Sequence, residues 1–209
     1  MTNKFAKHYN KIFRDKSYKA EAIALGLLMK KGTVLDVGCG TGLHAQELIK
    51  LGFVVEGLEP HSVLYEQSKK LMTVYNNRIE DSDIQKTYDN VICMFQVLNY
   101  VDDAKLAIKR IHSLLNKNGK LIIDMLTEES QLKQKVWVWD WLYSRYITTE
   151  RGRHSIWVNY NFPFLGIKDS FKHVTPPHKN IVGLLNDSGF TVDKIIFNGM
   201  DNLIICTAQ

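Results

Sequence analysis

The sequence predicts an α/β fold with a doubly wound, seven-stranded, mostly parallel sheet and a β-rich insertion. Three features predict it: apolar strand segments alternate with helical segments, a glycine-rich turn follows the first strand, and an aromatic, β-branched stretch lies late in the chain. Alternating strands and helices imply right-handed βαβ units and hence a parallel sheet. The length of 209 residues suits one domain, 1–209, with a sizeable core.

Apolar periodicity places the elements of the first half of the chain. Apolar residues recur at helical spacing in 16–30, Gly52 ends one helix, and Asn118 with Gly119 closes another. Short apolar runs bounded by turn residues are typical of buried strands. Strands are therefore expected at 33–37, 53–58, 73–77, 88–95 and 120–126, and helices at 16–30, 43–51, 61–72 and 102–115.

The second half departs from this alternation. Residues 134–165 are rich in Trp, Tyr and β-branched residues, which predicts an antiparallel lid insertion with a turn near 150–152. A helix is expected at 177–188, and the strands 190–197 and 202–207 are joined by the hairpin signal Asn198-Gly199. The two closing strands complete the sheet with an antiparallel end.

The N-terminal stretch, 1–30, is predicted to be a helical flap. It carries Phe5, Tyr9, Phe13 and Tyr18 interleaved with Lys and Arg, and it precedes the first core strand. Because residues 1–22 precede that strand, the core fold is expected not to require them. Two interpretations stay open: a helix packed on the sheet edge, or a flap that closes over a ligand and brings Tyr9 or Tyr18 to it.

Composition and charge exclude several classes of protein. The net charge is +5, but the basic residues are scattered and do not form the dense stripe of a nucleic-acid site. No apolar run could span a bilayer, and the N-terminus lacks the apolar core of a signal peptide, so we expect a soluble, cytoplasmic protein. The three cysteines, Cys39, Cys93 and Cys206, form no CxxC pair, which predicts buried thiols and no metal site.

The strongest chemical signal is the run VLDVGCGTG, residues 34–42. Glycines between a strand and a helix let the backbone turn tightly and approach a ligand closely. The spacing here is GxGxG and Leu43 follows it, whereas the dinucleotide-binding fingerprint is GxGxxG. This difference disfavours a nicotinamide oxidoreductase. The acidic Asp36 before the turn suits a cationic ligand group, such as the ammonium of S-adenosylmethionine.

Further candidates follow the next strands. Glu59 stands about 20 residues past the turn, where a carboxylate can accept both ribose hydroxyls of an adenosine. An adenine ring can lie against Ile79, which follows the third strand. The stretch MFQVLNY, residues 94–100, follows the fourth strand and is expected to line the methionine part of the ligand and the mouth of an acceptor pocket.

These segments resemble, in order, four motifs of the class I S-adenosylmethionine-dependent methyltransferases. LDVGCGTG resembles the first motif, GLEPH the acidic-loop motif, YDNVICMFQVLNYV the fourth, and LLNKNGKLIIDM a later one; the resemblance covers about residues 30–209. It implies a Rossmann-like methyltransferase fold with S-adenosyl-L-methionine as cofactor. The implied cofactor-binding residues are Asp36, Gly38, Cys39, Gly40, Gly42, Glu59, Pro60, Ile79, Glu80, Phe95 and Gln96.

The N-terminal sequence narrows the resemblance. YNKI, residues 9–12, and KSYKAEA, residues 16–22, resemble the sugar-nucleotide N-methyltransferase branch, whose members also carry a β-rich lid between the fifth strand and the last helix. Arg78 departs from the pattern, because many relatives have an acidic residue there. Ile79 and Glu80 are therefore the expected adenine contacts.

Methyl transfer from a sulfonium needs positioning more than acid chemistry, since the leaving group is a neutral thioether. A neutral amine attacks without a strong base, whereas a hydroxyl needs a base or a metal. Tyr9, Tyr18 and His154 are the candidate catalytic residues, and His173 and His178 are further candidate bases. The expected acceptor is an amine or hydroxyl of a small molecule, with an aminosugar nucleotide as one candidate. No nucleic-acid or membrane partner is expected, and the protein is expected to be a monomer or homodimer.

Two other functions stay open. Enzymes that methylate exocyclic base amines commonly carry an Asn/Asp-Pro-Pro-aromatic motif after the fourth strand, where this chain reads FQVLNY, which disfavours RNA or another macromolecule as acceptor. A non-catalytic cofactor-binding protein is disfavoured by the intact glycine-rich turn and by Glu59.

Overall fold

The computed structural model describes residues 1–128, 135–138, 145–152, 155–176, 178–197 and 202–209. It describes the side chains of these residues except those of 135–138, 145–152, 164 and 178. A seven-stranded sheet forms the centre, with the strand order β10-β11-β5-β4-β1-β2-β3. Neighbouring strands are parallel except for β11, which is antiparallel to both β5 and β10. The predicted doubly wound α/β fold is confirmed.

The central strands come from the segments that the apolar runs predicted, with differences at the ends. The strand predicted to begin at 120 starts five residues earlier, because Leu115 already pairs with Tyr88 after helix α6 ends at Ser113. The third strand shrinks to two residues. The bounds are β1 Thr33–Val37, β2 Val54–Leu58, β3 Val74–Tyr75, β4 Tyr88–Cys93, β5 Leu115–Met125, β10 Phe190–Phe197 and β11 Asn202–Ala208.

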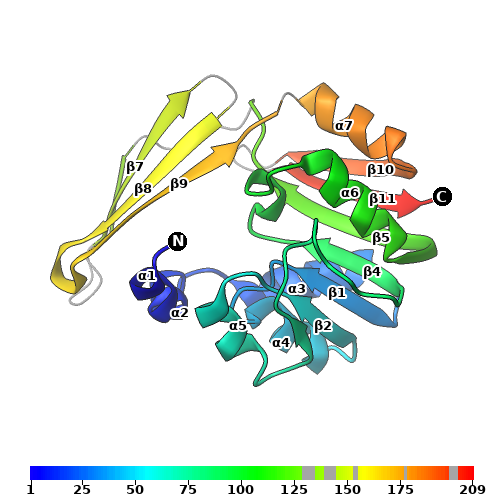
Figure 1. Ribbon diagram of the computed structural model, residues 1–209, viewed down its shortest axis with the longest axis horizontal. Helices are drawn as coiled ribbons and strands as arrows, with labels where there is room; N and C mark the ends of the chain where they lie inside the picture. Colours follow the sequence, from blue (N-terminus) through cyan, green and yellow to red (C-terminus); the bar gives the residue numbers. More distant parts are fainter. Residues whose placement is uncertain (129–134, 139–144, 153–154, 177, 198–201) are drawn as a thin grey trace.

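Helices cover both faces of this sheet (Figure 1). Successive strand residues point to opposite faces, so Val34 and Ile122 pack with α3 (Tyr18–Leu28) and α4 (Leu43–Lys50). Leu35 and Ile123 pack on the other face with α6 (Ala104–Ser113) and α7 (His178–Asp187). The helix α5 (Ser62–Ser68) follows β2. No described helix is long and apolar enough to cross a membrane.

A second, four-stranded antiparallel sheet forms the lid (Figure 1). Its order is β6-β7-β8-β9, with β6 Lys135–Val138, β7 Arg145–Gly152, β8 Ser155–Phe162 and β9 Ile167–Val174. The predicted insertion ended at 165, whereas the sheet continues to Val174. Strand β9 reads IKDSFKHV, in which polar residues obscure the strand signal.

The turn predicted near 150–152 does not lie at those residues. Glu150, Arg151 and Gly152 all belong to β7, and Gly152 pairs with Ser155. Residues 153–154, and with them the candidate base His154, lie outside the described residues. Strands β8 and β9 are joined by the short helix η2 (Pro163–Leu165) and by Gly166, whose φ of 56° favours glycine.

The N-terminal helices α1 (Asn3–Lys7) and α2 (Tyr9–Ile12) lie between the lid and the core (Figure 1). The Thr2 backbone N–H donates to Asp169 Oδ2 of the lid at 2.7 Å. On the core side, Gln67 of α5 donates to the Ala6 carbonyl at 3.5 Å. Phe5 and Ile12 are buried with Phe162 and Ile167 of the lid. This segment therefore bridges the two sheets.

Candidate active site

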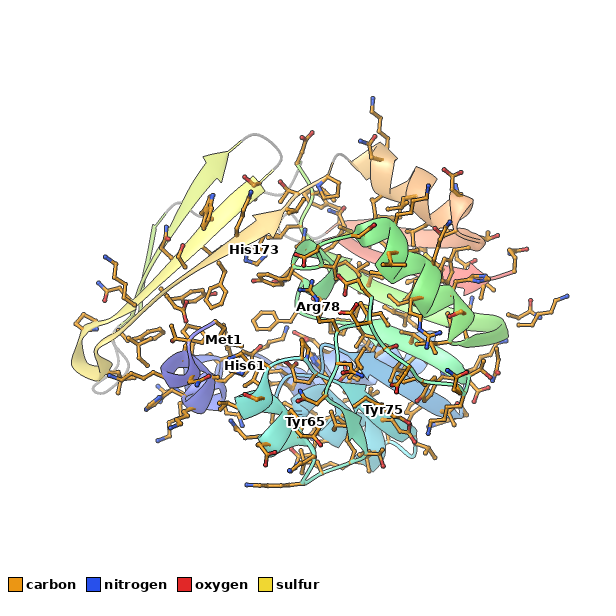
Figure 2. The ribbon with its side chains drawn as sticks, in the orientation of Figure 1. Met1, His61, Tyr65, Tyr75, Arg78 and His173 are labelled. Atoms are coloured by element: carbon orange, nitrogen blue, oxygen red, sulfur yellow. The ribbon has the colours of Figure 1, made fainter. Side chains whose placement is uncertain are left out.

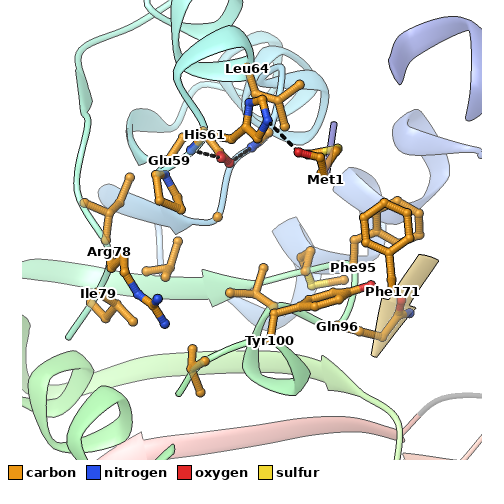
Figure 3. Close-up of a pocket in the computed structure, with 18 of the residues that line it drawn as sticks. Met1, Glu59, His61, Leu64, Arg78, Ile79, Phe95, Gln96, Tyr100 and Phe171 are labelled. Carbon is orange, nitrogen blue, oxygen red and sulfur yellow. Dashed lines mark hydrogen bonds between the residues drawn. The ribbon is translucent and has the colours of Figure 1, made fainter. Parts of the chain in front are cut away.

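A cavity of about 380 Å³ opens where the parallel strands β1, β2 and β4 end, and it continues beneath the lid (Figure 3). Gly38 follows β1, Glu59 follows β2 and Phe95 follows β4, and all three line it. Strand β1 has β2 on one side and β4 on the other, so the strand order reverses at this point. Ligands of open α/β sheets bind at such switch points.

The glycine-rich turn presents its backbone to this space. Gly38 and Gly40 have φ values of 68° and 57°, which disfavour residues with a side chain. A Cβ on Gly38 would lie 2.5 Å from Val97 Cγ2. A Cβ on Gly40 would meet only Tyr9 Cε1, at 3.9 Å, so it would enter space that the fold leaves open. A Cβ at Gly40 would therefore block a bound ligand, whereas it would clash with no other described part of the protein.

Glu59 braces the turn from the neighbouring strand. Its side chain is buried, Oε2 accepts from the Gly40 backbone N–H at 2.8 Å, and Oε1 accepts from the His61 N–H at 2.8 Å (Figure 3). Burial raises the pKa of this carboxyl, against the lowering effect of the two backbone bonds. Each carboxylate oxygen keeps a second lone pair. The group can therefore still accept hydrogen bonds from two ribose hydroxyls.

Asp36 is a buried carboxyl in need of a partner. It is 2% exposed, and Oδ2 has no hydrogen-bond partner among the described residues. Burial, with the charge of Glu59, raises the pKa of Asp36 to about 8. A buried carboxylate is costly unless an opposite charge or donor satisfies it. The ammonium of the expected cofactor is such a partner.

A small side pocket joins Asp36 to the N-terminal segment. Tyr9, Tyr18, Gly38, Cys39 and Gly40 also line it. The Tyr18 hydroxyl is buried without a partner in the described part of the chain. It is a donor that a carboxylate could use, beside an acid that an ammonium could use. The pocket therefore fits the amino-acid end of S-adenosylmethionine.

The opposite end of the cavity is formed by residues after β3. Ile79 is buried and Glu80 lies beside it, and both line the cavity as predicted for an adenine site. Arg78 pairs with Glu80 at 3.1 Å and with Asp102 at 2.8 Å. Because its charge is shared between two carboxylates, this end is not an anion site. Figure 3 shows Arg78 and Ile79 on one side and Phe171 on the other.

The turn after β4 holds two non-glycine residues in the left-handed region. Phe95 and Gln96 have φ values of 68° and 59°, a conformation that costs about 1–2 kcal/mol per residue. Asp124 of β5 accepts from the Gln96 N–H at 2.5 Å. This charge-assisted bond offsets part of the strain. It also fixes the turn between the two ends of the cavity.

Aromatic side chains enclose the part of the cavity beneath the lid. They come from the N-terminal segment, from the core after β4 and from the lid, and they are Phe5, Tyr9, Phe13, Phe95, Tyr100, Tyr160, Phe171 and His173. Burial raises the pKa of the Tyr9 hydroxyl well above its usual value, so the phenol stays protonated. Among the described lining residues, Arg78 is the one Lys or Arg.

Most of the predicted site residues lie together. Those that line the main cavity are Tyr9, Gly38, Gly40, Glu59, Pro60, Ile79, Glu80, Phe95 and Gln96, and Tyr18, Asp36 and Cys39 line the side pocket. Gly42 lines neither, because it caps α4 with a φ of 84°, against Leu71 and Met72. His154 lies outside the described residues. No group of three described His, Cys, Asp or Glu residues could hold a metal.

Several lining residues were not singled out by any sequence pattern. Tyr100 lines the cavity, as expected of the stretch 94–100, but it was not singled out within that stretch, and His173 was only one of several candidate bases. Tyr160 and Phe171 carried no local signal, since their strand pairing alone brings them to the cavity. His44 of the side pocket was read only as part of a helix.

Comparisons with known proteins agree with this geometry. The family described as "Methyltransferase domain" matches residues 9–195. A ubiquinone biosynthesis O-methyltransferase from Bradyrhizobium diazoefficiens is 31% identical over 100 residues, which span 44% of this chain and only 39% of that relative.

Two solved structures share the fold. DesVI from Streptomyces venezuelae superposes with a TM-score of 0.83 at 18% identity, over 98% of each chain. S-adenosylmethionine-bound CalS10, an amino pentose methyltransferase from Micromonospora echinaspora, superposes with a TM-score of 0.80 at 18% identity, over 94% of this chain and 93% of that one. The family match over residues 9–195 shows that the chain belongs to this family of methyltransferase domains, and the two superpositions show the shared fold.

Proposed function

We propose that this protein transfers a methyl group to an amine or hydroxyl of a small molecule. One observation supports this proposal most: a single cavity runs from the glycine-rich turn and Glu59 to an aromatic enclosure beneath the lid. S-adenosylmethionine, when bound, supplies a methyl group activated by its sulfonium. Everything else required is positioning and exclusion of water, for which an enclosed cavity is suited.

On the cofactor side, each polar group has one role in the proposal. Glu59 accepts the ribose hydroxyls, and Asp36 pairs with the ammonium. Tyr18 donates to the carboxylate, because burial and the nearby Glu21 raise the pKa of its hydroxyl to about 12 and keep its proton in place. Ile79 and Glu80 face the adenine.

On the acceptor side, the lid and the N-terminal helices α1 and α2 enclose the substrate. Tyr9 lines both the main cavity and the side pocket, so it stands where cofactor and acceptor would meet. Its protonated phenol orients a nucleophile by hydrogen bonding. Because its pKa is raised, the phenolate that could act as a base does not form. His154 stays a candidate base, and it lies outside the residues that the structure describes.

An aminosugar nucleotide is the first acceptor to try. The N-terminal resemblance supports it, and so does the fold shared with an amino pentose methyltransferase. The curated O-methyltransferase relative keeps hydroxyl acceptors in consideration. Both groups carry a lone pair on an atom that also bears hydrogen, which is the property that the proposal requires.

The test is mass spectrometry of reactions with methyl-labelled cofactor and a panel of aminosugar nucleotides, simple amines, alcohols and phenols. The expected result is one labelled methyl on a small molecule. Labelling of RNA in place of every small molecule would favour the macromolecule alternative. Tight binding of adenosylhomocysteine with no product from any acceptor would favour a non-catalytic protein.

A further inference from the structure

A tyrosine of the core and a histidine of the lid meet in the wall of the cavity. Tyr100 follows the short helix η1 (Val97–Asn99), and His173 lies on β9. Tyr100 Oη lies 2.7 Å from His173 Nε2, and the ring centroids are 4.5 Å apart. Both residues line the cavity, and Figure 2 shows His173 where the lid strand reaches the core. Nothing described above gives this pair a role.

The neighbours of the pair hold it in register. The Asn99 side chain donates to the carbonyls of Leu126 and Val174, and its Oδ1 accepts from the Leu126 N–H at 2.9 Å. Asn99 precedes Tyr100, and Val174 follows His173. One buried amide therefore docks the end of β9 on η1 and fixes the separation of the two rings. Fixed polar pairs of this kind give directional hydrogen bonds.

The polarity of the hydrogen bond follows from acid strength. His173 is 4% exposed, its Nδ1 has no partner among the described residues, and burial lowers its pKa to about 4. The imidazole is therefore neutral and has one accepting nitrogen. A phenol is a stronger acid than a neutral imidazole N–H, so the Tyr100 O–H donates to Nε2. The Tyr100 oxygen is left with its lone pairs, and 44% of the residue's surface is exposed.

We propose that the Tyr100 oxygen accepts a hydrogen bond from the methyl acceptor and that His173 is the positioning residue that fixes this direction. The inference rests on the proposed function and narrows its substrate class. An N–H or O–H held by Tyr100 leaves the nucleophile's lone pair free to face the methyl group. Primary and secondary amines, alcohols and phenols satisfy this condition. Carboxylates and thiolates carry no hydrogen on the reacting atom and gain nothing from the pair.

The first test reads the pair without turnover. Long-range ¹H–¹⁵N spectra of labelled protein, saturated with adenosylhomocysteine, report which nitrogen of each histidine carries hydrogen. We expect His173 to be neutral at pH 7 with hydrogen on Nδ1, and to lose this preference in Tyr100→Phe. His44, which bonds Glu21 at 2.6 Å, serves as the internal control and should not change. Hydrogen on Nε2, or a charged imidazole at pH 7, overturns the proposal.

The second test uses an acceptor that the wild-type protein methylates in the panel above. Tyr100→Phe should lower kcat/KM roughly two- to tenfold, as expected for one lost hydrogen bond to a polar substrate. Adenosylhomocysteine affinity should stay within about threefold. This control excludes a structural collapse, which would lower both kcat/KM and the affinity for adenosylhomocysteine. Full activity in Tyr100→Phe overturns the proposal.

Variants of the histidine separate positioning from simple packing. His173→Gln keeps an acceptor near the Nε2 position and should retain more activity than His173→Leu. In a Tyr100→Phe background, His173→Leu should cause no further loss, because the histidine acts only through the tyrosine. Additive losses overturn the proposal. If the wild type methylates nothing, the proposed function fails while the NMR result still decides whether the pair has the inferred polarity.

Discussion

The two ends of the cavity are built differently. The cofactor end uses backbone turns and carboxylates at the tips of neighbouring parallel strands, where Gly38, Gly40 and Glu59 are fixed by the sheet itself. The acceptor end uses side chains from three separate elements, such as Phe5 of α1, Tyr100 of the core and Phe171 of the lid. Under the proposed function, the shared sheet would hold the cofactor and the additions to it would hold the acceptor.

Substitutions that affect one end of the cavity and leave the other unchanged test this difference. The cofactor end depends on a few buried polar groups, so single substitutions there should have large effects on cofactor affinity. The acceptor end is a broad aromatic surface, so single substitutions there should change turnover by less.

The largest effect is expected from Gly40→Val. The added side chain enters the open space beside the turn, and φ of 57° disfavours a β-branched residue. Adenosylhomocysteine affinity measured by calorimetry should fall about a hundredfold, which corresponds to the upper part of an overpacking penalty of about 1–3 kcal/mol. Gly183→Ala is the matched control, since no atom lies within 4 Å of its added Cβ. Equal affinity in Gly40→Val would remove the turn from the site.

The cofactor end could be predicted from sequence because its geometry is local. A GxGxG turn after a strand has few possible conformations, and the carboxylate after the next strand must lie beside it. The bond from the Gly40 N–H to Glu59, at 2.8 Å, is the consequence. The identity of the expected ligand, S-adenosylmethionine, was inferred from the resemblance to known motifs. The residues after the third strand, Ile79 and Glu80, were placed by the same reasoning and line the cavity.

The contacts between the parts of the acceptor end could not be predicted, because they depend on tertiary pairing. His173 reaches Tyr100 only because Asn99 docks β9 on η1 across 75 residues of sequence. The role of Asp124 was missed for the same reason: its partner, the Gln96 N–H, lies on another strand's turn. Strand β9 itself was missed at the sequence level. Alternation within one segment carries no information about such partners.

A second substitution, Glu59→Ala, should weaken adenosylhomocysteine binding by about 2–3 kcal/mol. It removes the acceptor for the ribose and also the bonds to the Gly40 and His61 N–H groups. Glu59→Gln is the control, because it keeps the shape and one acceptor and should lose less. Calorimetric affinities and melting temperatures of both variants give the measurement. Wild-type affinity in Glu59→Ala would mean that the ribose lies elsewhere.

A third prediction concerns pH and Asp36, whose pKa of about 8 reflects burial and the charge of Glu59. A bound ammonium favours the ionised acid, so binding below pH 8 releases a proton and affinity should rise with pH, by up to about tenfold per unit. Calorimetry at pH 7 in buffers of different ionisation enthalpy measures that proton. Asp36→Asn should bind weakly and release none. An equal heat in all buffers for the wild type contradicts this prediction.

The same group links folding to pH in the opposite direction. Folded Asp36 keeps a proton that the unfolded chain loses near its ordinary pKa of about 4. The unfolding free energy of the ligand-free protein should therefore fall as pH rises from about 4 to 8, and this contribution should level off above pH 8. Melting temperatures of the wild type and of Asp36→Asn across this range test it. The variant should show a flatter profile.

The smallest effects are expected from removing single hydroxyls, and they sharpen the comparison most. Tyr18 lines only the side pocket beside Asp36, whereas Tyr9 lines both that pocket and the main cavity. Tyr18→Phe should therefore weaken cofactor binding by about 0.5–1.5 kcal/mol and leave the acceptor KM unchanged. Tyr9→Phe should change turnover and acceptor KM with little effect on cofactor affinity. Both should melt close to the wild type, because the rings and their packing remain.

Single-turnover rates, calorimetry and thermal melts separate these outcomes. Unchanged rates in both variants would leave the N-terminal segment as packing between the core and the lid, whereas a matched loss of cofactor affinity in both would mean that the two ends are not separable at Tyr9.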